Sequence, residues 1–411
     1  MMLFSIWIRL GWRNIFRNKR RSLIAGVAIG VGLASLIFVD ALMKGMENNM
    51  MEAATSTFLG QAEIQRRGFR GTRQTDLTIR RLSEILAKLA QDARIKNFSV
   101  RAISHGMVSS PSDVSSVELV GVDPTAEKEV SEIDEAIVRG SYFTGQNPQD
   151  IVIGYQLAET LQVTLGDRLV VTVSQVGTGL LSQDLFRVSG LCRFNIPAMD
   201  RGMAFVRLSK AREALGIGGN AHQIVLMFKN PEDGSNAALP FWGEYTQDDN
   251  EALGWPQLLP QMAAAFRLAR FSIYLTGLML FGVVALGIIN TLFMSLHERL
   301  FEFGVLKALG TRPEGIAGLI VCEAGSLAIL SSVLGCILGG LITLLASGVG
   351  IDYTGIEYAG VTIRKLIFPV LSVWQFIEYP LWVIFFTVLA GFYPALIAAG
   401  IPPAAAMRQG Q

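Results

Sequence analysis

Four long stretches of the chain carry no charged side chain: Leu23–Val39, Phe271–Leu296, Ala324–Ile351 and Pro380–Met407. A helix of about 20 apolar residues crosses the ~30 Å hydrocarbon core of a bilayer, so each stretch predicts a transmembrane helix. The first stretch is short, and it reaches the required length if Asp40 and Met43 lie at the outer interface. The predicted transmembrane helices are 22–44, 266–295 (with a stalk), 315–349 and 378–401.

The long segment 45–265 has the pattern of a soluble domain in which helices and strands are mixed. Leu77–Leu89 places its apolar residues on one helical face. Alternating positions predict strands at Arg168–Val173, Phe186–Leu191, Met203–Val206 and Ile224–Phe228. Residues 230–250 are rich in turn formers and predict a loop, followed by a helix from about Pro256 that continues into the second transmembrane helix.

The distribution of charge gives the topology. Only 17% of the residues are charged and the net charge is +1, against about 25% charged residues in soluble proteins. Cytoplasmic flanks of transmembrane helices are enriched in Lys and Arg, and six such residues precede the first helix: Arg9, Arg13, Arg17, Lys19, Arg20 and Arg21. Arg364 and Lys365 in the predicted outer loop 350–377 run against this trend.

The predicted fold class is therefore an α-helical membrane protein with four transmembrane helices. A large α+β extracytoplasmic domain is inserted between helices 1 and 2. Both termini, the 296–314 loop and the 402–411 tail are expected in the cytoplasm.

Residues 1–21 predict a helix on the cytoplasmic membrane surface, because Arg9, Arg13 and Arg17 recur every four positions beside apolar side chains. The alternative is that this segment is simply the positive flank of the first transmembrane helix. A cleavable signal peptide, with cleavage after Ala41, fits less well because Asp40–Lys44 does not resemble a cleavage site.

Small residues recur within the spans: Gly26 and Gly30 in the first, and Gly335 and Gly339 in the third. Such spacing allows close backbone approach between helices. It is compatible with packing inside one subunit and with dimerisation.

No constellation for catalysis, metal binding or nucleotide binding occurs in the sequence. The three histidines lack neighbours at metal-ligand spacing, and no G-x-x-x-x-G-K-[ST] motif is present. Asp40, Asn290 and Glu323 are the polar residues in or at the ends of the spans, without the further acid, His or Lys that a proton relay needs. We predict a non-enzymatic membrane subunit that holds no cofactor or metal and does not bind nucleic acid.

The segment 290–310, NTLFMSLHERLFEFGVLKALG, resembles the inner loop of the FtsX-like permease family, which includes lipoprotein-releasing and macrolide-exporting permeases. Further resemblance lies at Trp12–Asn14, Tyr393–Ala395 and Ile401–Ala404. Residues 121–124 and 154–173 in the inserted domain resemble lipoprotein-releasing permeases in particular.

The resemblance implies the membrane subunit of an ABC transporter in the bacterial inner membrane. ATP and Mg²⁺ would bind a separate dimeric ATPase, and a second permease subunit, identical or different, would complete the transporter. The segment 296–309 would form a short helix that docks on the ATPase, with Glu298, Arg299 and Glu302 exposed and Leu300, Phe303 and Leu306 packed. The expected coupling residues are Glu298, Arg299, Glu302, Phe303, Lys307 and Gly310.

The expected function is extraction of lipoproteins from the inner membrane for transfer to a periplasmic carrier. Acyl chains would enter from the membrane lipid through a small-residue seam between the first helix of this chain and the second helix of its partner, marked by Val31, Phe38, Gly277 and Gly282. The loop 174–186 is expected to be either a carrier contact, through Gly179, Leu180 and Leu181, or an ordinary hairpin loop. The alternatives are export of small hydrophobic molecules or peptides and regulation of a cell-wall hydrolase through transmitted motion.

Overall fold

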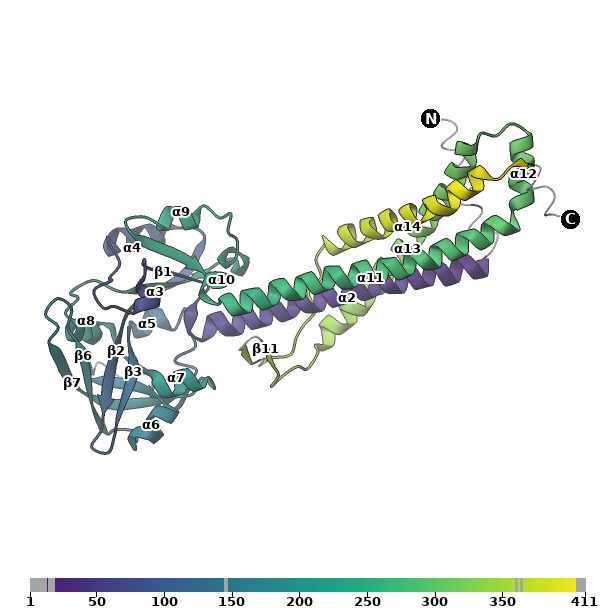
Figure 1. The fold of residues 1–411 in the computed structure, drawn as a ribbon. Helices are drawn as coiled ribbons and strands as arrows, with labels where there is room; N and C mark the ends of the chain where they lie inside the picture. The colour runs from purple at the N-terminus through teal and green to yellow at the C-terminus, as the bar shows by residue number, and fades with distance from the viewer. Residues whose placement is uncertain (1–12, 14–18, 144–146, 359–360, 363–364, 404–411) are drawn as a thin grey trace. The chain divides into compact units, whose positions relative to one another are not determined.

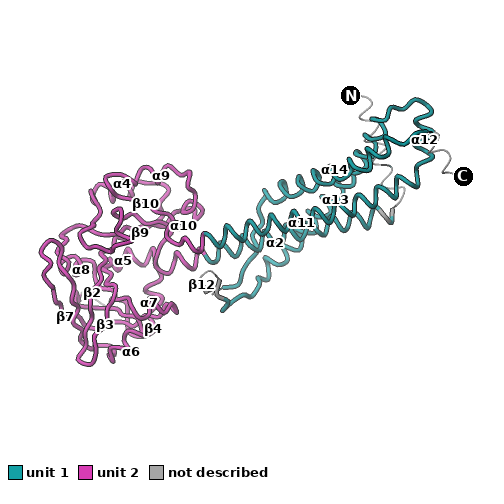
Figure 2. Tube along the Cα trace, in the orientation of Figure 1, with its two compact units in different colours: residues 1–50, 264–411 teal, residues 51–263 magenta. Residues whose placement is uncertain are grey.

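The computed structural model describes residues 13, 19–143, 147–358, 361–362 and 365–403. The chain forms two compact units, which are coloured separately in Figure 2. The helical unit comprises Met1–Met50 and Ala264–Gln411, and the sheet unit comprises Met51–Ala263. The sheet unit is therefore an insertion between two parts of the helical unit.

In the helical unit, four of the described helices are long and apolar enough to cross a membrane. They are α2 (Lys19–Ala54), α11 (Pro260–Glu298), α13 (Pro313–Val349) and α14 (Gln375–Gly400). Figure 1 shows α2 and α11 as two long helices that both lead into the sheet unit along the chain. The short helix α12 (Leu300–Ala308) connects α11 to α13.

Glycines allow α2 and α13 to pack closely against each other. A Cβ atom at Gly335 would lie 2.8 Å from the carbonyl oxygen of Gly30, and one at Gly339 would lie 3.0 Å from the Cα of Ala34. Both distances are too short for a larger residue without movement of the backbone. The small-residue spacing of the first and third spans therefore serves packing within one subunit.

The connection between α13 and α14 folds back onto α2. Ile351 pairs with Ile367, and the backbone N–H of Val370 donates to the carbonyl of Ala41 at 2.9 Å. A Cβ at Gly45 would clash with the backbone of Phe368 at 2.2 Å. Two short strands, β11 (Glu357–Tyr358) and β12 (Val361–Thr362), form a hairpin in this connection.

In the sheet unit, the described strands form one mixed sheet in the order β10-β1-β9-β2-β3-β8-β5-β7-β4, with β6 paired to β2 and β7. Their bounds are β1 Ala62–Arg66, β2 Ile95–Ser109, β3 Val114–Val122, β4 Ile137–Gly140, β5 Asp150–Gly154, β6 Arg168–Ser174, β7 Leu181–Cys192, β8 Met203–Arg207, β9 Gln223–Phe228 and β10 Asn250–Gly254. Because β6 joins β2 to β7, the strands β2, β3, β8, β5, β7 and β6 close into a ring. The pairs β3–β8 and β5–β7 are parallel, and the other pairs are antiparallel.

Helices complete the hydrophobic cores of the sheet unit. The ring strands pack with α6 (Tyr155–Leu161) and α8 (Leu208–Leu215) in one core. The β1–β9–β10 part packs with α4 (Leu82–Gln91) and α9 (Phe241–Tyr245) in another. The remaining short helices are α3 Phe69–Thr72, α5 Pro124–Glu127, α7 Pro197–Gly202, α10 Trp255–Leu258, the π-helix η1 Thr55–Leu59 and the 3-10 helix η2 Pro231–Gly234.

Two local predictions need correction. Residues 230–250 are not a plain loop, because η2 and α9 form there and Phe241 of α9 is fully buried against Phe228. The helix expected from about Pro256 is interrupted: α10 ends at Leu258 and α11 begins at Pro260. Proline favours the first turn of a helix, where its missing N–H needs no partner, and Pro260 therefore suits a new helix start.

Candidate functional site

The turn between α11 and α13 brings the residues expected to contact an ATPase into one segment. Helix α11 ends at Glu298, the backbone of Arg299 is not helical, and α12 begins at Leu300. Gly310 has a φ of +93°, and the N–H of Thr311 donates to the carbonyl of Leu306 at 3.0 Å. A left-handed glycine just past the last turn ends a helix without steric cost, so the structure gives Gly310 a role in terminating α12.

Arg299 is not exposed as expected, because its side chain faces the helical unit. Its Nε lies 3.0 Å from a carboxylate oxygen of Glu302, and its Nη1 lies 3.3 Å from Glu323 of α13. The guanidinium also lies over the ring of Phe303, which is 5% exposed. Only 14% of the Arg299 side chain is exposed. Arg299 therefore fastens α12 to α13, and Glu323 is its counter-ion.

Lys307 also faces inwards. Its ammonium group donates to the carbonyl oxygens of Ala399 and Ile401, both at 2.6 Å. These carbonyls lie at the end of α14, where backbone acceptors lack partners within the helix and a cation is favourable. Lys307 thus ties α12 to α14.

The exposed face of α12 is apolar. Phe301 is 53% exposed and Leu309 is 80% exposed, with the partly exposed Val305 between them at helical spacing. We call Phe301, Val305 and Leu309 the α12 stripe. Glu298, at the end of α11, is exposed near it, and 39% of the Glu302 side chain is exposed. This stripe was not expected from the sequence, because charged residues usually occupy the exposed face of a short helix.

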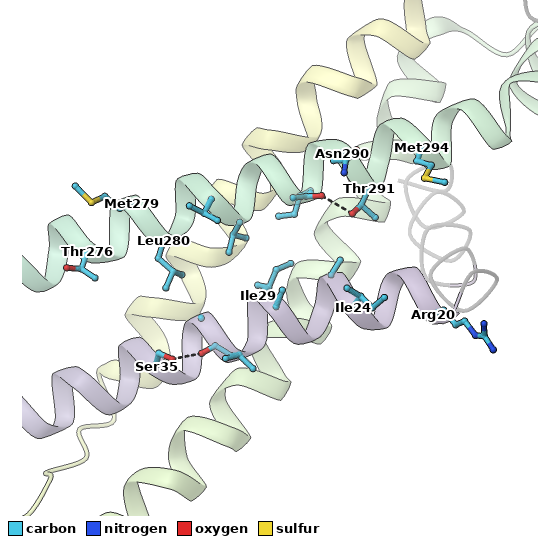
Figure 3. Close-up of a pocket in the computed structure, with 18 residues that line it drawn as sticks. Arg20, Ile24, Ile29, Ser35, Thr276, Met279, Leu280, Asn290, Thr291 and Met294 are labelled. Carbon is cyan, nitrogen blue, oxygen red and sulfur yellow. Dashed lines mark hydrogen bonds between the residues drawn. The ribbon is translucent and has the colours of Figure 1, made fainter.

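A large apolar groove runs between α2 and α11. Its volume is about 1110 Å³, and Figure 3 shows side chains of both helices pointing into it. The hydroxyls of Ser35 and Thr291 donate to the carbonyls of Val31 and Gly287 in their own helices, at 2.9 and 2.8 Å. The groove wall is therefore largely apolar, with Arg20 and Asn290 towards one end.

The residues expected to mark a substrate seam lie in different places. Val31 lines the groove and is 50% exposed. Gly277 is buried against Leu36, while Gly282 is exposed on α11, and Phe38 is partly buried. Of the four, the structure brings only Val31 to the groove.

The surface of α11 is the least covered among the described spans. The most apolar stretch of α11 is 22% buried, whereas that of α2 is 44% buried and those of α13 and α14 are each 39% buried. An apolar helix that remains uncovered within its own subunit faces lipid or another chain.

The loop between β6 and β7 is a short hairpin connection. Gly177 and Gly179 adopt positive φ angles, and the N–H of Gln175 donates to the carbonyl of Leu180 at 2.8 Å. Leu180 is 65% and Leu181 is 70% exposed. This hairpin with an apolar tip is compatible with both the carrier contact and the ordinary loop.

Of the membrane-surface arginines, Arg9 and Arg17 lie outside the described residues. Arg13 is described and its side chain is exposed. Among the residues that the structure describes, no group of three or more His, Cys, Asp or Glu side chains is arranged to hold a metal ion.

A buried polar cluster lies inside the sheet unit and includes residues of the segments that follow α2 and precede α11 along the chain. Arg101 of β2 is fully buried, its Nε lies 3.2 Å from Glu127, and its guanidinium stacks 3.9 Å from the ring centre of Phe58 in η1. Arg70 contacts Glu63 of β1 at 3.4 Å and donates to the carbonyl of Leu258 in α10. We call Phe58, Glu63, Arg70, Arg101 and Glu127 the junction cluster.

The two acidic side chains of the junction cluster, Glu63 and Glu127, are fully buried beside basic groups. Burial raises the pKa of Glu63, while the nearby Arg70 and Arg101 act in the opposite direction. The carboxylate of Glu127 also accepts hydrogen bonds from Ser99 at 2.7 Å and Ser131 at 2.8 Å. This cluster could not be expected from the sequence, because its members are far apart in the chain and belong to no motif.

Comparisons with known proteins cover most of the chain. Residues 22–238 match the model of the MacB-like periplasmic core domain, and residues 274–403 match that of the FtsX-like permease C-terminal domain. The chain is similar to the lipoprotein-releasing system transmembrane protein LolE of Haemophilus influenzae, at 23% identity over 96% of this chain and 97% of the relative. It is also similar to LolC of Neisseria meningitidis, at 20% identity over 83% of this chain and 82% of the relative.

Among solved structures, the periplasmic region of MacB from Actinobacillus actinomycetemcomitans matches with a TM-score of 0.37 and 13% identity. The match covers 52% of this chain and 95% of that structure.

Proposed function

Because this chain belongs to the FtsX-like permease family and carries a MacB-like periplasmic core domain, it is a non-catalytic transmembrane subunit of an ABC transporter, and we propose that it extracts lipoproteins from the inner membrane. The observation that carries the proposal is the apolar groove between α2 and α11. The relatives named as lipoprotein-releasing proteins, which align with most of the chain, support it.

ATP hydrolysis in a partner subunit would act on this chain through α12. The α12 stripe offers an exposed apolar surface for the ATPase. Arg299 and Lys307 join α12 to α13 and α14, and the chain itself joins it to α11. A displacement of α12 would therefore move these helices together rather than bend the connecting turn.

The junction cluster supports transmission of that movement to the periplasmic domain. Arg101 connects η1, which continues α2, to strand β2. Arg70 connects α10, which precedes α11, to strand β1. The segments that adjoin the two long helices along the chain therefore contact strands of the sheet unit through guanidinium groups, of which that of Arg101 is fully buried and that of Arg70 is partly exposed.

The groove suits acyl chains on energetic grounds. Moving a chain from lipid into an apolar groove replaces one apolar environment with another and costs little. Exposing it to water costs about 0.8 kcal/mol per CH₂ group. ATP is therefore needed to release the lipoprotein towards a carrier rather than to admit it.

A photo-crosslinker at Val31 is expected to capture lipoprotein in the nucleotide-free transporter and to lose it once ATP is bound. Val31 lines the groove, and closure would expel the acyl chains. The measurement is the amount of lipoprotein adduct on gels of membranes that contain the full transporter.

Val39 is the matched control for this experiment. It is the same residue type on the same helix and is 44% exposed, but it does not line the groove. Equal capture at both sites would contradict the lipoprotein proposal. Capture of a small hydrophobic molecule at Val31, without lipoprotein, would support export, and the absence of both would favour regulation of a cell-wall hydrolase.

We further propose that both termini lie in the cytoplasm, supported by the basic residues before the first transmembrane helix. A reporter inserted near Asp233 is expected to score as periplasmic. Reporters near Arg312 and after Gln411 are expected to score as cytoplasmic. The measurement is the paired activity of alkaline phosphatase and fluorescent-protein fusions. A cytoplasmic score near Asp233 would contradict the proposed topology.

The remaining partners follow from the same proposal. The ATPase subunit is expected as a dimer that holds ATP and Mg²⁺, and a second permease copy or homologue would cover the uncovered face of α11. The exposed leucines of the β6–β7 hairpin are the proposed carrier contact.

A further inference from the structure

A second pocket, lined by both acidic and basic residues, lies between α2, α11 and the start of α14, at the other end of the spans from α12. Its volume is about 220 Å³. The charged residues that line it are Asp40, Lys44, Glu47, Arg270 and Glu378. We propose that this pocket binds the zwitterionic phosphoethanolamine headgroup of a membrane phospholipid.

A hydrogen bond and an ion pair between lining residues hold the walls of the pocket together. Gln375, which is 3% exposed, donates to a carboxylate oxygen of Asp40 at 2.7 Å. Arg270 lies 3.2 Å from Glu47 and so bridges α11 and α2. These contacts fix three helices around one opening.

Of the five charged residues that line the pocket, one basic and one acidic side chain are available to a ligand. In the part of the chain that the structure describes, the side chains of Lys44 and Glu378 have no ion pair or hydrogen bond, and both are partly buried. A ligand phosphate would be drawn to Lys44, and a ligand ammonium, with three N–H donors, would be drawn to Glu378 and Asp40.

The mixture of acidic and basic side chains in the pocket favours a zwitterionic ligand. With three carboxylates and two basic groups, a simple anion would face more like charges than opposite charges. A simple cation would leave Lys44 without a counter-ion. A headgroup that carries both charges satisfies each side.

The position of the pocket along the helices matches the headgroup level of a bilayer. The charge-free stretch of α2 ends at Val39, directly before Asp40. Tyr274 lines the pocket at 52% exposure, and Trp374 lines it at 68% exposure. Trp and Tyr concentrate at membrane–water interfaces, so a bound phospholipid would place its acyl chains along the exposed apolar surface of α14.

The test measures binding of dioctanoyl phosphatidylethanolamine to the full chain in detergent. Lys44→Gln and Glu378→Gln are each expected to weaken binding about tenfold, because each removes one charge-assisted contact. Dioctanoyl phosphatidylglycerol, which has no ammonium, is expected to bind more weakly than phosphatidylethanolamine and to lose no affinity on Glu378→Gln.

Glu314→Gln is the matched control, since Glu314 lies in the first turn of α13 as Glu378 does in that of α14, and it does not line the pocket. It is expected to leave the affinity unchanged. The thermal midpoint of each variant shows whether the fold is retained. Equal affinity for the two lipids, or unchanged affinity in both folded pocket variants, would overturn the proposal.

Discussion

Replacing Arg101 by methionine is expected to lower the free energy of unfolding of the periplasmic domain by about 3–5 kcal/mol, because it leaves a buried carboxylate without its counter-ion. Glu127 is fully buried, and Ser99 and Ser131 supply only neutral hydrogen bonds to it. The cation–π contact with Phe58 is lost as well. The measurement is urea-dependent pulse proteolysis of the detergent-solubilised chain.

Two further variants separate the ion pair from general packing. Arg139→Met, at an exposed position of β4, is expected to change stability by less than about 0.5 kcal/mol. Arg101→Met combined with Glu127→Leu is expected to recover most of the loss, because replacing both partners by apolar groups removes the buried charge. A full loss in the double variant would show that packing, rather than charge, is what Arg101 supplies.

Arginine side chains make the ion pairs both at α12 and in the junction cluster. At α12, Arg299 pairs with Glu302 and Glu323. At the junction cluster, Arg101 pairs with Glu127 and Arg70 with Glu63. A guanidinium group offers several directed donors and stacks on aromatic rings, so it holds an orientation better than an ammonium group does. This arrangement suits a protein whose proposed task is to carry movement between two distant partners.

The membrane-spanning elements were predictable from sequence, because the hydrocarbon core excludes charge and leaves long charge-free runs. The full lengths of the helices were not. Helix α2 continues to Ala54, past Lys44 and Glu47, because charged residues outside the hydrocarbon core are compatible with a helical backbone. Hydropathy therefore reports where a helix crosses lipid and not where it ends.

The topology of the periplasmic domain lay beyond the sequence pattern. Alternation predicted β6 and β8 close to their observed bounds. It could not show that β6 pairs with both β2 and β7 and so closes a ring, because pairing is set by contacts between distant segments. The helix α9 was missed because its short apolar run lies in a polar stretch, and packing on Phe228 stabilises it.

The prediction that Arg299 is exposed on α12 was wrong for a similar reason. A charged residue on a short helix is usually solvent-exposed, and no pattern in the sequence indicates that Glu323, on the next helix, supplies a counter-ion. Glu323 is an acid within a predicted span, and the sequence pattern indicates neither a proton relay nor an ion-pair partner for it. Lys307 likewise finds its acceptors about ninety residues away, at the end of α14.

This orientation changes which substitutions are expected to uncouple the transporter. Phe301→Glu places a carboxylate in the α12 stripe, on the face that we propose docks on the ATPase. Burying an uncompensated charge costs several kcal/mol, so the affinity for the ATPase is expected to fall at least about a hundredfold. Co-purification and transport-coupled ATP hydrolysis would be lost, while the chain would remain folded because Phe301 is 53% exposed.

Val349→Glu is the matched control for this prediction. Val349 is 78% exposed at the last turn of α13, at the other end of the spans from α12. The same change of residue type there is expected to leave ATPase binding intact. The measurement is the dissociation constant between the full chain in nanodiscs and the purified ATPase. If Phe301→Glu binds the ATPase as tightly as Val349→Glu does, the α12 stripe is not the docking surface, and the inward-facing charges of Arg299 and Lys307 would have to be released to reach the partner.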